Sequence, residues 1–386
     1  MERQDLDERS LLDLGMDELR HILGEGWEVA HLNSGKPVGG NGVAEPDLGI
    51  DEVWTVRHLA STMPAGEVLV EAKTNLSPAV AAGVLGPRVS LMRRLRKQAA
   101  VLVIAPWLSP RTRQVLDGKG FGYLDLTGNV SIKLSQPAIL IRTEGEQRSP
   151  VPERRGRRGL SGPRAARLVR ELVDFEPPRR ANELARATGI SESYVSRLLD
   201  SMNDEALITR DGRVITDVDW SALLRTRASA HELLRANHVV AVVARQGRNR
   251  LLDALRVNKG RHRVVATGSF AAAAVAPTTV GGPLMLYVPP GPQVADEVAK
   301  DLALLRADDS QGRSRVSDVM LLQPMSDGAF DRPQRERVGG VECVGLSQLV
   351  LDCLSGPGRM PAEGEAVLAW MQAHEGDWRK SSPLAE

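Results

Sequence analysis

The sequence is poor in cysteine, has no long apolar run and carries almost no net charge. Its two cysteines, Cys343 and Cys353, have neither CxxC spacing nor a histidine partner pattern, which favours small core residues of a reducing compartment over a zinc site or a disulfide. No apolar run approaches the ~20 residues of a membrane-spanning helix, and the acidic, amphipathic start differs from a signal peptide. We therefore expect a cytoplasmic protein without a membrane partner.

Charge and composition leave the class of partner open. The 50 Lys and Arg nearly cancel the 49 Asp and Glu, so only the distribution of charge can indicate or exclude a nucleic-acid partner. The contents of 42% hydrophobic and 26% charged residues are typical of a folded protein. A chain of 386 residues exceeds what one hydrophobic core usually supports, which predicts roughly two to three domains.

Composition divides the chain into three blocks and a linker. Residues 1–148 alternate helical and strand patterns, and residues 149–162 cluster Pro, Gly and Arg without hydrophobic periodicity. Residues 163–228 carry helical periods followed by a short two-strand pattern, and residues 229–380 return to mixed helix and strand signals. We predict a multidomain protein that combines α/β and α+β domains.

The stretch EVLVEAKTNLSP in the first block raises the question of catalysis. Its apolar run ends at an acid and a base instead of at a turn residue. If Ile50–His58 and Glu67–Thr74 pair as an antiparallel hairpin, the start of the first strand lies beside the end of the second. Asp51 then lies near Glu71 and Lys73.

This grouping of charges suits a metal-dependent nuclease. Asp51 and Glu71, helped by the carbonyl of Ala72, could hold Mg²⁺ with several waters retained, as this hard ion prefers. Lys73 would orient or activate the attacking water and stabilise the charge that grows on a scissile phosphate. Glu-x-Lys spacing is also common at solvated strand ends, and the motif by itself favours that simpler interpretation.

The order of predicted elements in the first block carries a family resemblance. Helix, strands, Glu-x-Lys, helix, strand, helix and strand follow one another, and in this order the block resembles the PD-(D/E)xK superfamily with its restriction-endonuclease-like α/β/α core. "EAK" stands at Glu71–Lys73, and the upstream acid is Asp51, which suits the hairpin register, or Asp47, which suits the literal "PD". The resemblance implies a Mg²⁺-dependent endodeoxyribonuclease, or a relative that keeps the fold without cleavage. Some relatives carry a further acid on the first helix, where this chain has Glu18, although a surface glutamate is the favoured interpretation of this residue.

The segment YLDLTGN has two interpretations. Asp125 and Asn129 are residue types that serve in catalysis, but both also tolerate the left-handed backbone angles of a tight turn such as one containing Gly128. We favour the turn.

The middle block carries the strongest pattern in the chain. Apolar periods predict three helices, with Gly189 in the turn before the third and Ser191 as the cap of the third. Asp211–Gly212, between two β-prone runs, predicts a hairpin. The block thus resembles a winged helix-turn-helix DNA-binding domain, whose third helix fits a major groove.

Each part of this pattern has a use on DNA. The third helix can meet base edges or phosphates, two arginines flank the wing, and a basic arm precedes the domain. The candidate DNA-binding residues are Ser191, Ser193, Tyr194, Ser196 and Arg197 on or near the helix, Arg210 and Arg213 at the wing, and Arg155, Arg157 and Arg158 in the arm. A protein-interaction winged helix and a merely solvated arginine linker are the alternatives.

The C-terminal block offers a second resemblance. Gly268–Ser269 looks like the opening of a nucleotidyltransferase site, but the following strand LMLYV lacks the closely spaced acids of such enzymes, so we expect no catalysis there. The segment SQLVLDCLSGPGRMPAEGEAVLAWM and the strand, Gly-Ser and alanine-rich helix pattern resemble the AbiEi-like antitoxins of bacterial type IV toxin–antitoxin systems. The resemblance implies a C-terminal α/β domain for sensing, oligomerisation or partner contact, with a cognate toxin or a second copy of the chain as partner.

Three functions follow, in order of preference. The first is a bacterial DNA-binding transcriptional regulator of antitoxin type, whose winged helix reads duplex DNA. The second is a Mg²⁺-dependent DNA endonuclease that the same winged helix directs to its site. The third is an interaction protein that neutralises a toxin.

Overall fold

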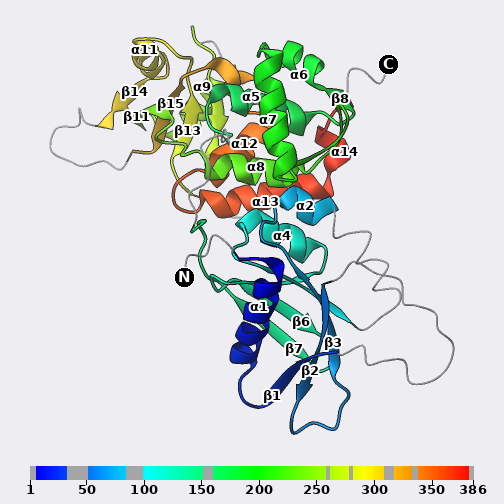
Figure 1. Cartoon of the computed structure of the whole chain (residues 1–386). Coiled ribbons are helices and arrows are strands. Elements are labelled where there is room, and N and C mark those ends of the chain that lie inside the picture. Colours follow the sequence, from blue (N-terminus) through cyan, green and yellow to red (C-terminus); the bar gives the residue numbers. More distant parts are fainter. Residues whose placement is uncertain are drawn as a thin grey trace. The chain divides into compact units, whose positions relative to one another are not determined.

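The chain folds into two compact units of mixed α/β structure (Figure 1). The first unit contains Met1–Arg157 with Asn203–Ala206, and the second contains Arg158–Met202 with Leu207–Glu386. The computed structural model describes residues 6–32, 51–83, 99–150, 160–257, 261–277, 281–307, 317–332 and 338–381. The predicted site residues Asp47, Arg155, Arg157 and Arg158 lie outside these ranges. Within them, no helix is long and apolar enough to cross a membrane.

The first unit is a seven-stranded mixed sheet with helices on both faces. Its elements are α1 (Glu8–Leu23), β1 (Trp27–His31), β2 (Glu52–His58), β3 (Gly66–Ala72), α2 (Pro78–Gly83), β4 (Ala100–Ala105), α4 (Pro110–Gly118), β5 (Gly122–Asp125), β6 (Val130–Leu134) and β7 (Ile139–Thr143). The strands lie in sequence order from β1 to β7. The central strands β3, β4 and β5 are parallel, and the outer pairs are antiparallel.

One face of this sheet is covered by α1. Asp7 caps the helix by accepting the backbone N–H of Ser10 at 2.8 Å, and an apolar stripe spaced at helical intervals packs on the sheet. The buried residues of this layer include Leu11, Leu12, Met16, Leu19, Trp54, Val70 and Ile104. Gly15 permits the close approach, because a Cβ at this position would lie 2.5 Å from Cδ1 of Ile104.

The opposite face is covered by α2 and α4. Ser109 caps α4 by accepting the N–H of Thr112 at 3.0 Å, and Pro110 takes the first helical position, as the sequence predicts. The apolar residues of this second layer include Leu69, Val101, Val103, Leu116 and Phe121. The buried strands β3 and β4 therefore contribute side chains to both layers, which explains their nearly continuous apolar sequences.

The first half of the second unit consists of four helices and a small sheet. Its elements are α5 (Pro163–Asp174), β8 (Arg179–Arg180), α6 (Ala181–Thr188), α7 (Glu192–Asp204), β9 (Ile208–Asp211), β10 (Val214–Val218) and α8 (Trp220–Ser229). The three strands lie in the order β8-β10-β9, and all pairs are antiparallel. Gly189 ends α6 with a φ of +65°, where a residue with a Cβ would be strained. The predicted helices, turn and hairpin are thus confirmed.

The second half adds a five-stranded sheet and further helices. Its elements are β11 (Asn237–Ala244), α9 (Arg248–Val257), β12 (Val265–Thr267), α10 (Gly268–Val275), β13 (Leu284–Tyr287), α11 (Val294–Asp301), β14 (Leu304–Arg306), β15 (Val319–Pro324), η2 (Asp327–Phe330), α12 (Leu346–Leu354), α13 (Met360–Ala373) and α14 (Glu375–Trp378). The strand order is β12-β13-β15-β11-β14; β13 and β15 pair in parallel, and the other neighbouring strands of this order pair antiparallel.

The two halves of the second unit share one core. A single cluster of buried apolar residues runs from Leu160 to Met371, and α12 packs against both α5 and α8. Cys343 and Cys353 are free thiols buried in this core, as expected. The sequence divides these halves at residue 228 by composition, but their hydrophobic contacts join them.

Candidate functional site

The β2–β3 hairpin brings the predicted nuclease-like residues together. Glu52 pairs with Val70, so Asp51 lies beside Glu71, and Oδ2 of Asp51 accepts the backbone N–H of Ala72 at 2.8 Å. The backbone N–H of Lys73 donates to the carbonyl of Ile104 at 2.9 Å, which continues the pairing of β3 with β4. Nζ of Lys73 lies 2.8 Å from Oε1 of Glu71 and 4.0 Å from Oδ2 of Asp51.

A third carboxylate joins this group from α1. Oε1 of Glu8, in the first turn of the helix, lies 3.2 Å from Nζ of Lys73. Glu18, for which the sequence favours a surface position, lies ten residues further along the helix, or about 15 Å along its axis, so the two glutamates occupy different ends of α1. The signal that could have identified Glu8 is its place directly after the helix cap Asp7, where the start of α1 can reach the ends of the central strands.

Burial and charge act in opposite directions on this cluster. Glu71 is only 7% exposed, and burial raises the pKa of its carboxyl above the usual value although the hydrogen bond from Lys73 lowers it. Burial alone would lower the pKa of Lys73, but the hydrogen bond and charge of Glu71, with the nearby Glu8 and Asp51, raise it. Burial therefore favours the neutral form of Glu71, whereas the surrounding carboxylates favour the charged form of Lys73.

The donor chemistry of the cluster fits a hard divalent cation. Carboxylate and carbonyl oxygens are the ligands such ions prefer, and Asp51, Glu71 and the carbonyl of Ala72 supply them. In the described ranges, however, no three acidic, His or Cys side chains are arranged to hold a metal. The ammonium group of Lys73 contacts Glu8, Glu71 and the Ala72 carbonyl, the last at 3.0 Å. Mg²⁺ could use these oxygens only after Lys73 has moved.

Asp125 organises a turn, as favoured from the sequence. Its carboxylate is fully buried and accepts hydrogen bonds from the backbone N–H groups of Leu108, Thr127 and Asn129 at 2.9 to 3.1 Å. The side chains of Thr127 and Asn129 donate to it as well, at 2.6 and 2.9 Å. Gly128, within the turn, has a φ of +95°. With so many internal donors, this carboxylate is a structural group.

The predicted DNA-contacting residues of α7 lie at its exposed start. The carbonyl of Ser191 accepts the N–H groups of Tyr194 and Val195 at 3.0 and 3.1 Å, so the helix begins immediately after it. Ser191, Ser193 and Arg197 are exposed, and Tyr194 and Ser196 are half-buried. The opposite side of α7 packs into the core through Val195, Leu198, Leu199 and Met202.

Two arginines of α5 flank this surface and were missed from the sequence. Cζ of Arg164 lies 6.0 Å from the centroid of the Tyr194 ring, at the limit of a cation–π contact. Arg167 donates to the carbonyl of Thr188, next to the turn that precedes α7, at 2.9 Å. The spacing of three residues puts both arginines on the exposed side of an amphipathic helix, a pattern that the segment PRAARLVRELVD contains.

The two wing arginines differ in their surroundings. Arg213 is exposed in the two-residue loop between β9 and β10, where Asp211 pairs with Val214. Arg210 donates to Asp200 of α7 at 2.6 Å, and its side chain is only 17% exposed. Arg213 is therefore placed for an external contact, whereas Arg210 ties the wing to α7.

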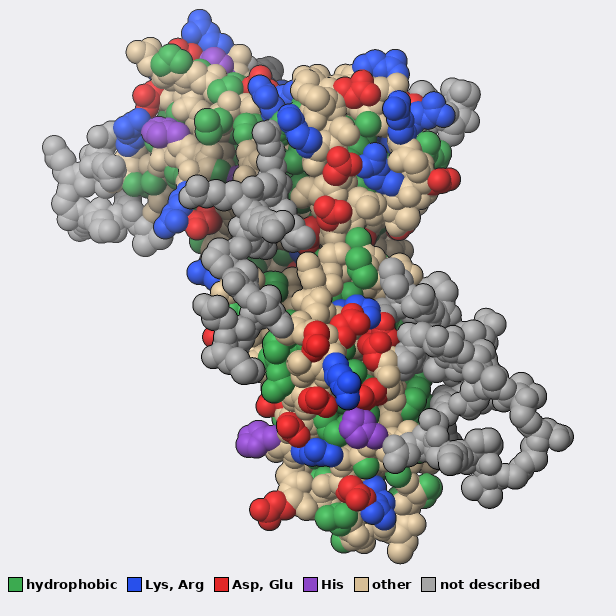
Figure 2. Space-filling view, in the orientation of Figure 1, with side chains coloured by type: hydrophobic (Ala, Val, Ile, Leu, Met, Phe, Trp, Pro, Cys, Tyr) green, Lys and Arg blue, Asp and Glu red, His purple; other side chains and the backbone are tan. Residues whose placement is uncertain are grey.

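Charges of both signs cover the surfaces around these residues. Figure 2 shows acidic side chains gathered over α1 in the first unit, and Lys and Arg side chains over the region of α6 in the second. An acidic surface repels the phosphates of DNA unless a cation intervenes, whereas a basic surface attracts them.

Comparison of the chain with known proteins finds no matching family model, curated protein or solved structure.

Proposed function

We propose that the protein binds duplex DNA through a winged helix-turn-helix formed by α5 to α8. The observation that carries this proposal is the surface at the start of α7, where Ser193 and Arg197 are exposed beside Arg164 and Arg167. The order of α6, turn, α7 and hairpin is that of a winged helix, and the strand order β8-β10-β9 supports it. Both α5 and α7 bury apolar side chains in the common core, and each leaves polar side chains such as Arg164 and Arg197 exposed.

On DNA, each part of this surface would have a separate task. The start of α7 would enter the major groove, where Arg197 and Ser193 meet base edges or phosphates. Arg164, Arg167 and Arg213 would contact phosphates on either side. The resemblance to antitoxin-type regulators adds the proposal that the protein acts in transcriptional regulation, with a cognate toxin or a second copy of the chain as partner.

Binding to duplex DNA across a salt series tests this proposal. Wild-type affinity, measured by fluorescence anisotropy on fragments from the protein's own locus, should fall steeply with salt, because each phosphate contact contributes a slope of about −0.9 in log K against log salt. Arg197→Ala should weaken binding by about 1–3 kcal/mol if the side chain reads a base, or reduce the slope by about 1 if it contacts a phosphate.

A matched control separates this effect from general loss of charge. Arg306 forms an exposed ion pair with Asp296 at 2.8 Å in the second half of the unit, and Arg306→Ala should leave DNA affinity unchanged. Salt-independent binding, or equal losses from Arg197→Ala and Arg306→Ala, would contradict the proposal.

A second candidate function is Mg²⁺-dependent cleavage of DNA by the first unit. The specific observation in its favour is that the hairpin places Asp51, Glu71 and Lys73 together at the end of the central strands. With helices on both faces of a mixed sheet, the unit is compatible with a restriction-endonuclease-like core. A bound Mg²⁺ would supply an activated water and charge stabilisation; Asp51 and Glu71 would hold the ion, and Lys73 would orient the water.

Nicking of supercoiled plasmid tests the second candidate. Wild-type protein should nick in Mg²⁺ or Mn²⁺ and not in EDTA, and Lys73→Ala or Glu71→Gln should reduce the rate by at least about a hundredfold, as for loss of a group that acts in the transition state. Lys119→Ala removes an exposed lysine at the end of α4 and should have no effect. Metal-purged and then metal-loaded protein that nicks no DNA would eliminate this candidate.

A further inference from the structure

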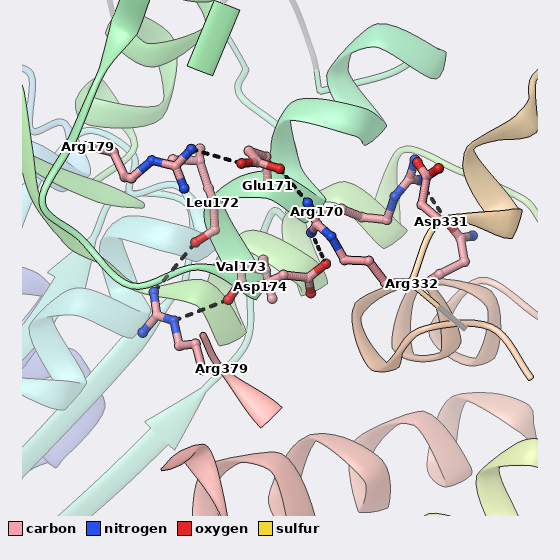
Figure 3. Close-up of polar contacts among 10 residues, drawn as sticks. Arg170, Glu171, Leu172, Val173, Asp174, Arg179, Asp331, Arg332 and Arg379 are labelled. Atoms are coloured by element: carbon pink, nitrogen blue, oxygen red, sulfur yellow. Dashed lines mark hydrogen bonds and ion pairs between the residues drawn. The ribbon is translucent and has the colours of Figure 1, made fainter. Parts of the chain in front are cut away.

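The last turn of α5 carries two shielded carboxylates that arginines from distant segments surround (Figure 3). The side chains of Glu171 and Asp174 are only 8% and 14% exposed. Arg179, which follows the helix, lies 2.8 Å from Glu171 and is itself 2% exposed. Carboxylates buried to this degree require cationic partners or hydrogen-bond donors, because their desolvation is costly.

Arg332 closes this arrangement from the second half of the unit. Its Nη2 lies 2.5 Å from Oε2 of Glu171, and its Nη1 pairs with Asp174, so one guanidinium bridges both acids. The guanidinium groups of Arg332 and Arg179 also lie over the ring of Phe175, with Cζ at 4.5 and 5.2 Å from its centroid. Arg332 follows η2, separated from α5 by more than 150 residues of chain.

The backbone at the end of α5 is held by residues near the C-terminus. Arg379 donates to the carbonyls of Val173 at 3.1 Å and Leu172 at 3.5 Å. The N–H of Lys380 donates to the carbonyl of Asp174 at 2.9 Å. These carbonyls belong to the last turn, where helical partners are lacking, so the C-terminal segment completes the helix.

Arg332, unlike the carboxylates that it bridges, is accessible to solvent. Its side chain is 35% exposed whereas the two carboxylates that it bridges are shielded, and its backbone has a φ of +52°, which is unfavourable for a residue with a Cβ. Withdrawal of Arg332 would leave Glu171 with Arg179 but would deprive Asp174 of the cation that bridges it to Glu171. Burial already raises the pKa of Asp174, against the charge of Arg332.

Asp331, next to Arg332, lies 3.7 Å from Arg170 of α5. We propose that Asp331–Arg332 is a latch by which the second half of the unit controls the DNA-binding surface. A partner that contacts this loop and withdraws Arg332 releases the end of α5. The released helix transmits the change to α6, which packs directly against α5, and then to α7 through the common core, which contains Leu184 of α6 and Leu198 of α7. Because coupling between two sites is reciprocal, DNA bound at α7 favours the seated latch. This inference rests on the proposed DNA-binding function.

Hydrogen–deuterium exchange of the full-length protein tests the latch without reference to DNA. Arg332→Ala should increase amide exchange in α5 and also in α6 and α7, while β11 and β15 keep wild-type protection. Arg332→Lys, which keeps the charge but not the two-pronged geometry, should give a smaller increase and guards against a variant that fails to fold. Arg306→Ala, the exposed control, should match wild type. Faster exchange confined to residues next to Arg332 would overturn the latch.

DNA binding by the same variants tests the control that the latch exerts. Arg332→Ala should bind about tenfold more weakly than wild type, a typical coupling magnitude, with an unchanged salt slope because no phosphate contact is lost. Wild-type protein that binds no DNA would contradict the proposed function and leave the exchange result to decide whether the helices are coupled. Equal affinity of Arg332→Ala and wild type, with altered exchange in α7, would overturn the regulatory role.

Discussion

At the scale of single residues, the second unit buries an acid whose protonation affects stability. Asp352 of α12 is fully buried and accepts hydrogen bonds from Thr267 at 2.6 Å, Gln348 at 2.7 Å and Tyr287 at 3.0 Å. Burial raises the pKa of its carboxyl from 3.8 to about 6, although these three donors lower it. The charged form is thus tolerated at a cost in stability.

The sign of the pH dependence follows from this raised pKa. The folded state favours the protonated carboxyl of Asp352. The stability that this preference contributes to the fold is present below about pH 4 and is lost as the pH rises to about 6. Asn can replace the acid, because its oxygen can accept from Gln348 and Tyr287 while its amide donates to the hydroxyl of Thr267. Asp352→Asn should therefore raise the free energy of unfolding at pH 7 by up to about 3 kcal/mol.

Urea unfolding at several pH values measures this effect. The difference between Asp352→Asn and wild type should be near zero at pH 4 and should grow up to pH 6 to 7. Asp296→Asn changes an exposed acid instead and should show no such growth. A difference that is constant with pH would refute the assignment to Asp352.

Single residues also show which parts of the candidate site can be predicted from the sequence and which cannot. Asp51, Glu71 and Lys73 could be grouped in advance, because a hairpin between adjacent strands fixes its register by alternation and a short connection. Glu8 can be recognised from the sequence as the residue after a helix cap, but its contact with Lys73 depends on the angle at which α1 crosses the sheet, which no local pattern contains. Arg332 pairs with Glu171 across 161 positions, and no local periodicity contains that information.

At the scale of elements, the packing of α1 depends on one small residue. An alanine in a helix is usually about 1 kcal/mol more favourable than a glycine. At Gly15 the added methyl group would meet Cδ1 of Ile104 at 2.5 Å, and overpacking of a core costs about 1–3 kcal/mol. Gly15→Ala should therefore leave the first unit equally stable or less stable by up to about 2 kcal/mol.

A second glycine provides the comparison. Gly118, at the end of α4, has nothing within 4 Å of its missing Cβ, so Gly118→Ala should be neutral or stabilising. In thermal unfolding, Gly15→Ala should have a lower melting temperature than Gly118→Ala. The reverse order would show that α1 can move away from the sheet at little cost.

Element prediction succeeded where local signals were complete. Capping residues, proline at a first helical position and glycine in the turn before α7 each act within a few residues, and the corresponding helix ends were found. The predicted boundary at residue 228 rests on hydrophobic periodicity and turn residues along the sequence. These local patterns do not show which apolar helix faces pack against each other, so they do not predict the common core of α5, α8 and α12.

At the scale of the whole molecule, the two proposed activities belong to different units. DNA binding relies on the exposed start of α7 in the second unit, and cleavage relies on the acid–lysine cluster in the first. Each can therefore be lost without the other, and the Arg197→Ala and Lys73→Ala experiments address them independently. A protein that binds DNA and never cleaves it would retain the fold of the first unit for another use.

The common core of the second unit has a practical consequence for protein engineering. A fragment limited to α5 to α8 would expose the apolar surfaces of α5 and α8 against which α12 packs. Grafting these helices onto another protein would therefore require α12 to be transplanted with them, together with the segment that supplies Arg379. The smallest transferable form of the proposed DNA-binding module is therefore discontinuous in the sequence.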